Sequence, residues 1–205
     1  MKNLFYLPLL FLVWIAKSIS FNWIIGSYRS VFSCSTMLAP VMAKHFGFGW
    51  LSLFFISPKL LITSQILFVV LHRTPLFFAA YAYQRRSWVT SLVVPFACMI
   101  LFVNHNVGQV AWCYSLYWLI PMGLYFVPDC LVARALTASF VAHGLGSVIW
   151  LYTTSIDASV WIALIPVVIC ERLLMAGGMV VVDDIMVRCK RWMQQILIAC
   201  KTGLA

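Results

Sequence analysis

Long, continuously apolar runs dominate this sequence, and short polar or turn segments separate them. An apolar run of about 20 residues can cross the hydrocarbon core of a bilayer as a helix. A membrane β-barrel would instead show alternating segments of about ten residues, which are not seen here. Only 9% of the 205 residues are charged, against roughly 25% in a soluble domain. The sequence therefore predicts an all-α, polytopic integral membrane protein with a single transmembrane domain over residues 1–205, and it excludes a soluble enzyme.

Seven apolar runs are candidate spans, so we expect a bundle of six to seven transmembrane helices. They are Leu4–Ile25, Ser35–Ile56, Leu60–Tyr83, Trp88–Val103, Gln109–Val127, Leu131–Thr153 and Ala158–Val182. The first run also has the charge, apolar stretch and small residues of a signal peptide. Retention of this segment as a helix agrees better with the orientation that the basic residues predict.

Basic residues lie at the ends of the apolar runs and predict the orientation of the chain. Arg85 and Arg86 follow the third run, and Arg188, Lys190, Arg191 and Lys201 follow the last one. Excess Lys and Arg mark cytoplasmic segments, and both groups can be cytoplasmic because four spans separate them. The 104–108 and 154–157 turns then face outward. We expect a bacterial cytoplasmic membrane protein, and the net charge of +9 does not indicate nucleic-acid binding.

The sequence offers no template for catalysis or for a cofactor. The seven cysteines have no CxxC spacing, which gives no support to a metal site or a disulfide framework. Segment 144–147 reads GLGS, which is not the serine motif of rhomboid proteases, and Glu171 is the only glutamate. We therefore expect a protein that is not an enzyme and that carries no cofactor and no metal.

Glu171 and Arg172 lie near the middle of the last run. Ionised groups at that depth cost several kcal/mol unless they are paired or face a polar cavity. Adjacent helical residues point about 100° apart, so each of the two needs a partner of its own. One interpretation is a structural ion pair that fixes helix packing. The functional one is that Glu171 lines a ligand cavity and that Arg172 docks a partner subunit.

Polar and aromatic residues near the outward turns predict a binding site for a small solute. Amide and imidazole groups can fix the polar edge of such a molecule, while indole rings cover its flat face. An ordinary solvated turn and a histidine hydrogen-bonded between helices are the alternatives. The predicted substrate-binding residues are Asn104, His105, Trp112, His143, Trp150 and Glu171.

Small residues recur at four-residue spacing in two stripes, which allow helices to approach closely. Packing inside the chain is the default interpretation, and docking of a partner subunit is the functional one. The stripes are Ala39, Ala43 and Gly47, and Ala138, Ala142 and Gly146.

The stretch STMLAPVMAKHFGFGWLSL (35–53) is similar to an early helix of the substrate-binding subunits of energy-coupling factor transporters. The small-residue stripes resemble the surface through which those subunits dock. The resemblance implies a six-helix subunit that captures a micronutrient-like solute from outside and works with a transmembrane coupling subunit and ATPases. This chain has seven candidate spans, and its clearer stripe lies late in the sequence. The competing hypothesis is a non-transporting membrane assembly factor or structural partner protein.

Overall fold

A computed structural model of the chain describes residues 35–51 and 66–202, and every regular element in these two ranges is helical, which confirms the predicted all-α class. The elements are α3 (Ser35–Phe46), the 3₁₀ segment η2 (Phe48–Leu51), α5 (Ile66–Gln84), the π-helical segment η4 (Val89–Val93), α6 (Val94–Val103), α7 (Asn106–Val110), the 3₁₀ segment η5 (Trp112–Trp118), α8 (Leu119–Leu124), α9 (Leu131–Thr153) and α10 (Ala158–Thr202).

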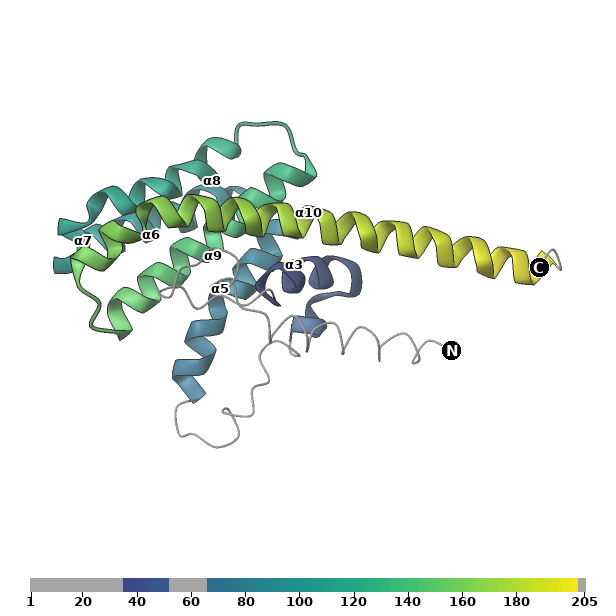
Figure 1. Ribbon diagram of the computed structural model, residues 1–205, viewed down its shortest axis with the longest axis horizontal. Helices are drawn as coiled ribbons and strands as arrows, with labels where there is room; N and C mark the ends of the chain where they lie inside the picture. The colour runs from purple at the N-terminus through teal and green to yellow at the C-terminus, as the bar shows by residue number, and fades with distance from the viewer. Residues whose placement is uncertain (1–34, 52–65, 203–205) are drawn as a thin grey trace.

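Helix α9 is the centre of the bundle and contacts α5, α6, α8, η5 and α10 (Figure 1). Its face toward α5 carries Ala135 and Ala138, both fully buried against Ala79 and Ala82. Residues this small let helix backbones approach closely. A second, aromatic part of the core lies where α6, η5 and α10 meet the other end of α9. This aromatic part surrounds the candidate site.

Two helices of the described ranges are long and apolar enough to cross a membrane. They are α9 (Leu131–Thr153) and the Ala158–Ile196 portion of α10, and Val89–Val103 is a shorter apolar helix. The bounds of α9 are those predicted from the sequence, and α10 begins at the predicted residue. However, α10 runs to Thr202 without a break, 20 residues past the predicted end at Val182. The extra length takes it beyond the bundle as a single helix (Figure 1).

Two other predicted spans are not continuous helices. The predicted Ser35–Ile56 helix ends at Phe46, because Gly47 has a φ of 91°, a conformation that glycine adopts readily. The predicted Gln109–Val127 helix is divided between α7, η5 and α8. A Cβ atom on Gly108 would lie 1.8 Å from the carbonyl oxygen of Phe102, so only glycine fits where α7 crosses the end of α6.

The remaining predicted spans agree with the described residues as far as these reach. Helix α5 covers the part of Leu60–Tyr83 from Ile66 onward, and η4 with α6 covers Trp88–Val103. The predicted Leu4–Ile25 span lies outside the described residues.

Candidate functional site

His143 lies at the centre of a chain of buried hydrogen bonds between α9 and η5. The indole nitrogen of Trp118 donates to His143 Nδ1 over 3.2 Å. Since an indole N–H can only donate, Nδ1 must accept, and the ring proton lies on Nε2. His143 Nε2 then donates to the hydroxyl oxygen of Tyr114 over 2.7 Å. The Tyr114 hydroxyl in turn donates to Ser147 Oγ over 3.3 Å. These contacts define a neutral imidazole whose two nitrogens are both used.

Aromatic rings enclose the Tyr114–His143 pair. The Tyr114 ring lies 5.0 Å from Trp161 and 5.5 Å from Phe102, with the distances measured between ring centroids. Trp161 is 3% exposed, and its indole nitrogen has no hydrogen-bond partner among the described residues. An unused donor in an apolar, aromatic surrounding carries a desolvation cost of about 1–3 kcal/mol. A polar acceptor from outside the chain would remove this cost.

Glu171 and Arg172 are buried on the inner face of α10, at 3% and 1% exposure. Arg172 Nη2 lies 3.4 Å from Glu171 Oε2, a long contact because neighbouring side chains on a helix diverge. Glu171 Oε1 is buried and accepts no hydrogen bond from the described part of the chain. The two adjacent side chains therefore make one long contact with each other, and Glu171 Oε1 has no partner among the described residues.

Arg172 links this pair to the aromatic part of the core. Its side chain is 1% exposed and lies within electrostatic range of Tyr114 and His143. Helical side chains lean toward the N-terminus of their helix, which for α10 is the end that carries Trp161. Ser139 on α9 donates from Oγ to the Arg172 carbonyl oxygen over 3.0 Å and holds the two helices together at this level. Polar groups therefore extend from Trp161 to Glu171 inside an apolar bundle.

The structure separates the other predicted binding residues from this interior set. His105 caps α7, accepting from the Val107 amide, and its ring lies 5.0 Å from Tyr152. Asn104 ends α6 on the surface. Trp112 is 52% exposed and Trp150 is 39% exposed. No contact within the described ranges joins these four residues to His143 or Glu171. The predicted pocket is thus divided into an interior set and a surface set.

Sequence reasoning missed Tyr114, Trp118 and Ser147 as partners of His143. Ser147 lies one helical turn after His143 on α9, and this spacing alone places both side chains on one face. Tyr114 and Trp118 are also four residues apart, but they lie in an apolar run where aromatic residues normally form core. No signal in the sequence connects the two pairs.

The small-residue stripes are used for packing within the chain. Ala39, Ala43 and Ala138 are at most 1% exposed. Ala142 and Gly146 are partly buried, and a Cβ atom on Gly146 would meet Pro75 of α5 at 4.0 Å. Gly47 is exposed and ends α3. The buried alanines and Arg172 therefore pack inside the chain, and docking of a partner subunit by the stripes stays a prediction.

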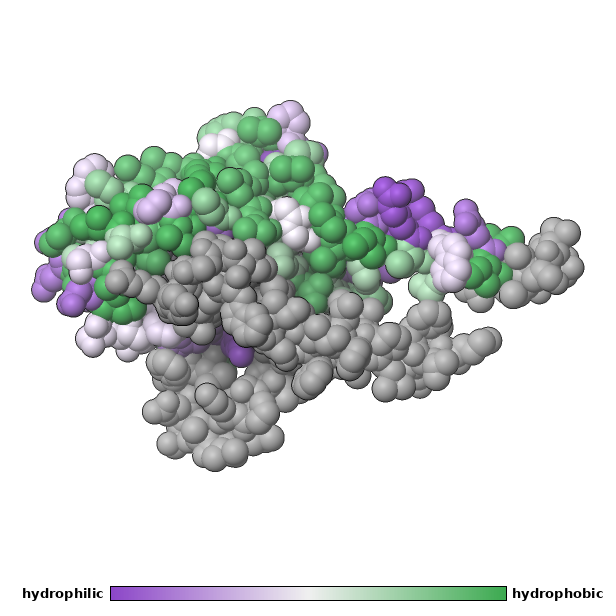
Figure 2. Space-filling model, in the orientation of Figure 1, coloured by the Kyte–Doolittle hydropathy of each residue, from purple (hydrophilic) through white to green (hydrophobic). Residues whose placement is uncertain are grey.

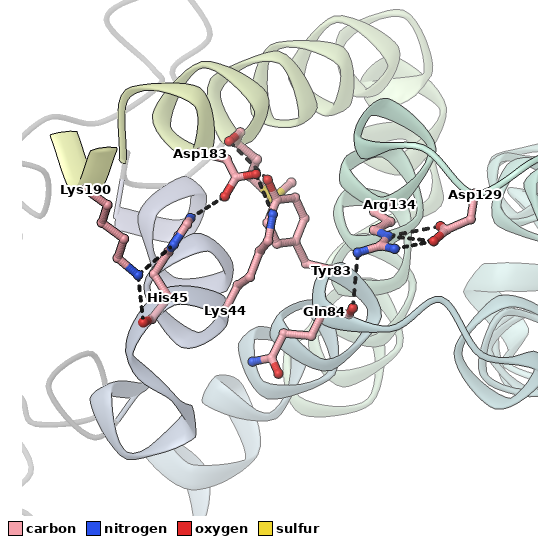
Figure 3. Close-up of polar contacts among 9 residues, drawn as sticks. Lys44, His45, Tyr83, Gln84, Asp129, Arg134, Asp183 and Lys190 are labelled. Carbon is pink, nitrogen blue, oxygen red and sulfur yellow. Dashed lines mark hydrogen bonds and ion pairs between the residues drawn. The ribbon is translucent and has the colours of Figure 1, made fainter. Parts of the chain in front are cut away.

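A second polar cluster joins α3 to α10 where α10 leaves the bundle (Figure 3). Asp183 is 2% exposed; Lys44 Nζ contacts its Oδ2 at 2.6 Å, and His45 Nε2 contacts its Oδ1. Lys190 donates to His45 Nδ1 over 3.1 Å, so this nitrogen accepts and the ring proton lies on Nε2. His45 Nε2 therefore donates to Asp183. Residues Lys44, His45, Asp183 and Lys190 are called the clamp below.

Beside the clamp, the turn before α9 is held by basic residues. Arg134 donates from Nε to both carboxylate oxygens of Asp129 at 3.0 Å, and Arg86 donates to the carbonyl oxygen of Val127. The hydrogen bonds from Arg134 hold the pKa of Asp129 below its ordinary value. Arg134 also reaches the carbonyl oxygen of Gln84 at 3.5 Å (Figure 3). The turn after α5, which the sequence predicts to be cytoplasmic, therefore lies beside the turn before α9.

Among the described residues, no group of three or more His, Cys, Asp and Glu side chains lies close enough to hold a metal ion. Comparison of the chain with protein-family models, with curated proteins and with solved structures gives no match.

Proposed function

We propose that the protein is the substrate-binding subunit of a multi-subunit uptake transporter in a bacterial cytoplasmic membrane. It would cross the membrane six or seven times, with α9 and α10 as two of the spans. The placement of its turns supports this orientation. The basic turns around Arg86 and Arg134 lie at one end of α9, and the His105 turn packs against Tyr152 at the other end.

The observation that carries this proposal is the buried polar series from Trp161 through Tyr114 and His143 to Glu171. An apolar bundle that serves only as a membrane anchor has no need of such groups, since each costs free energy to bury. Among the described residues, Trp161 Nε1 and Glu171 Oε1 in this series have no hydrogen-bond partner, and one is a donor and the other an acceptor. Flat rings between them suit a small, partly polar aromatic or heterocyclic solute that enters from the outer side.

Uptake of this solute needs an energy source that the sequence does not contain. The 205 residues include no GxxxxGK[ST] phosphate-binding loop. We therefore propose a transmembrane coupling subunit with ATPases as partners, in a lipid bilayer and without nucleic acid.

The test is solute binding by the full chain, purified in detergent and analysed by native mass spectrometry. We expect a small molecule to co-purify with the wild-type protein and to appear as an added mass in its spectrum. Trp161→Phe removes the open donor and Glu171→Gln removes the charge of the open acceptor, and each should weaken binding about 10-fold or more, the effect of one lost hydrogen bond to a charged or buried group. Trp112→Phe, which changes an exposed indole, and Leu173→Ile, at an exposed position, are the matched controls.

A different outcome would favour the second candidate function, a non-transporting assembly factor or structural partner. The observation in its favour is that both ring nitrogens of His143 are satisfied inside the chain. That function predicts no bound molecule in the wild type, and no uptake defect in a Trp161→Phe variant that folds normally. Either result would refute the transport proposal.

A further inference from the structure

The part of α10 that follows the clamp has no neighbour among the described helices along one of its faces. With 45 residues, α10 is about 68 Å long, more than twice the roughly 30 Å hydrocarbon core of a bilayer. Figure 1 shows its C-terminal half extending past the other described helices, and Figure 2 shows hydrophobic as well as hydrophilic residues along it. This half therefore lies outside the hydrocarbon when the first half spans it.

Four apolar residues follow one face of this projecting half, and we call them the α10 stripe. They are Ile185, Cys189, Trp192 and Ile196. Ile185, Trp192 and Ile196 are 52%, 64% and 41% exposed, and Cys189 is exposed as well. The spacing of four, three and four residues places them within a sector of about 60° around the helix. It is also the a/d spacing of a coiled-coil heptad.

Charges around the helix decide what the stripe can face. Lys190 and Arg191 point about 130° away from the centre of the stripe on either side. Lys190 is turned toward His45, so the clamp holds the opposite side of α10 against α3 and leaves the stripe outward. In a parallel pair of such helices, these two cations would lie outside the seam, where they do not repel each other. Arg188 would face Met193 of the other helix, the usual flanking pairing, and not another cation.

We propose that the α10 stripe pairs with the same stripe of a second copy of this chain, as a parallel two-stranded coiled coil. All copies of a membrane protein have the same orientation, so a twofold axis along the membrane normal aligns the helices in parallel. The seam is short, but confinement of both copies to one membrane plane raises the effective concentration of their helices. On the lipid side of the clamp, Val181 is 58% exposed on the same face and extends the contact. This proposal is independent of solute binding.

Cys189 gives a direct test, because it occupies an a-type position at which the two copies face each other. A full-length chain that keeps Cys189 as its single cysteine is oxidised in native membranes with copper phenanthroline. We expect a disulfide-linked dimer on a non-reducing gel. The matched control combines Cys189→Ser with Gln194→Cys, on the exposed opposite side of the helix, and should cross-link at least 10-fold less.

The native chain gives a second measurement if the single-cysteine variant does not fold. Light scattering of the detergent-purified protein should give twice the 23.3 kDa chain mass, and Trp192→Asp with Ile196→Asp should return it to the mass of one chain. Equal cross-linking of the two cysteine positions, a wild-type monomer, or cross-linking of Cys189 to another protein would each overturn the proposal.

Discussion

At the scale of single residues, the hydrogen bonds around His143 are compatible with only one tautomer of its ring. Trp118 offers an N–H to Nδ1, so a proton on that nitrogen would bring two donors together. The imidazole must therefore accept on one side and donate to Tyr114 on the other. A side chain that accepts one hydrogen bond and donates another at similar distances can replace the imidazole in part, and an apolar side chain cannot.

Substitution of His143 separates these cases. His143→Leu strands the buried indole N–H of Trp118, at a cost of roughly 1–3 kcal/mol, and leaves the Tyr114 hydroxyl with only Ser147 as its partner. His143→Gln keeps one donor and one acceptor and should lose clearly less. Thermal unfolding in detergent, followed by tryptophan fluorescence, measures both. Equal melting temperatures for the Leu variant and the wild type would show that the hydrogen-bonded series does not stabilise the bundle.

At the scale of helices, the clamp explains why α10 keeps its direction after it leaves the bundle. Helix α3 ends at Gly47, and its last turn presents Lys44 and His45 to Asp183. Lys190, two turns further along α10, donates to the carbonyl oxygen of His45 over 3.2 Å and lies 5.2 Å from the Phe46 ring. One short helix end therefore holds about two turns of α10, and a rigid base is what a projecting dimerisation helix requires.

Loss of the Asp183 charge should loosen this base. Asp183→Asn leaves Lys44 and His45 without their carboxylate in a mostly buried position, at a cost of roughly 1–3 kcal/mol and a lower melting temperature. Asp184→Asn is the matched control, because the partner of Asp184 in the described part of the chain is Arg188, on an exposed helix surface. Cross-linking through Cys189 should fall with the first change and not with the second. A clamp without structural importance would make the two variants indistinguishable.

At the scale of the whole molecule, the sequence predicts what depends on local periodicity and misses what depends on distant partners. The bounds of α9 and the start of α10 follow from apolar runs and turn residues. The extra length of α10 was missed because the polar residues after Val182 indicate the end of a span. In the structure, Asp183 and Lys190 bind side chains of α3, which lie 139–145 residues away in the sequence. The partners of His143 were missed for the same reason, since Tyr114 and Trp118 lie in a separate run.

The orientation of the bundle in the membrane is the prediction with the largest scale. The two ends of the bundle carry exposed residues at which it can be tested. Arg85 is exposed beside Arg86, in the turn that packs near Val127 and Arg134, while Ser155 lies in the turn after α9 at the opposite end. Positive residues mark the cytoplasmic side. A single cysteine introduced as Arg85→Cys should therefore resist an impermeant thiol reagent in intact cells and react after permeabilisation. Ser155→Cys should react in both conditions. Because position 85 is exposed in the fold, lack of labelling there reports the side of the membrane and not burial. Labelling of Arg85→Cys from outside would reverse the proposed orientation and contradict entry of the solute from the outer side.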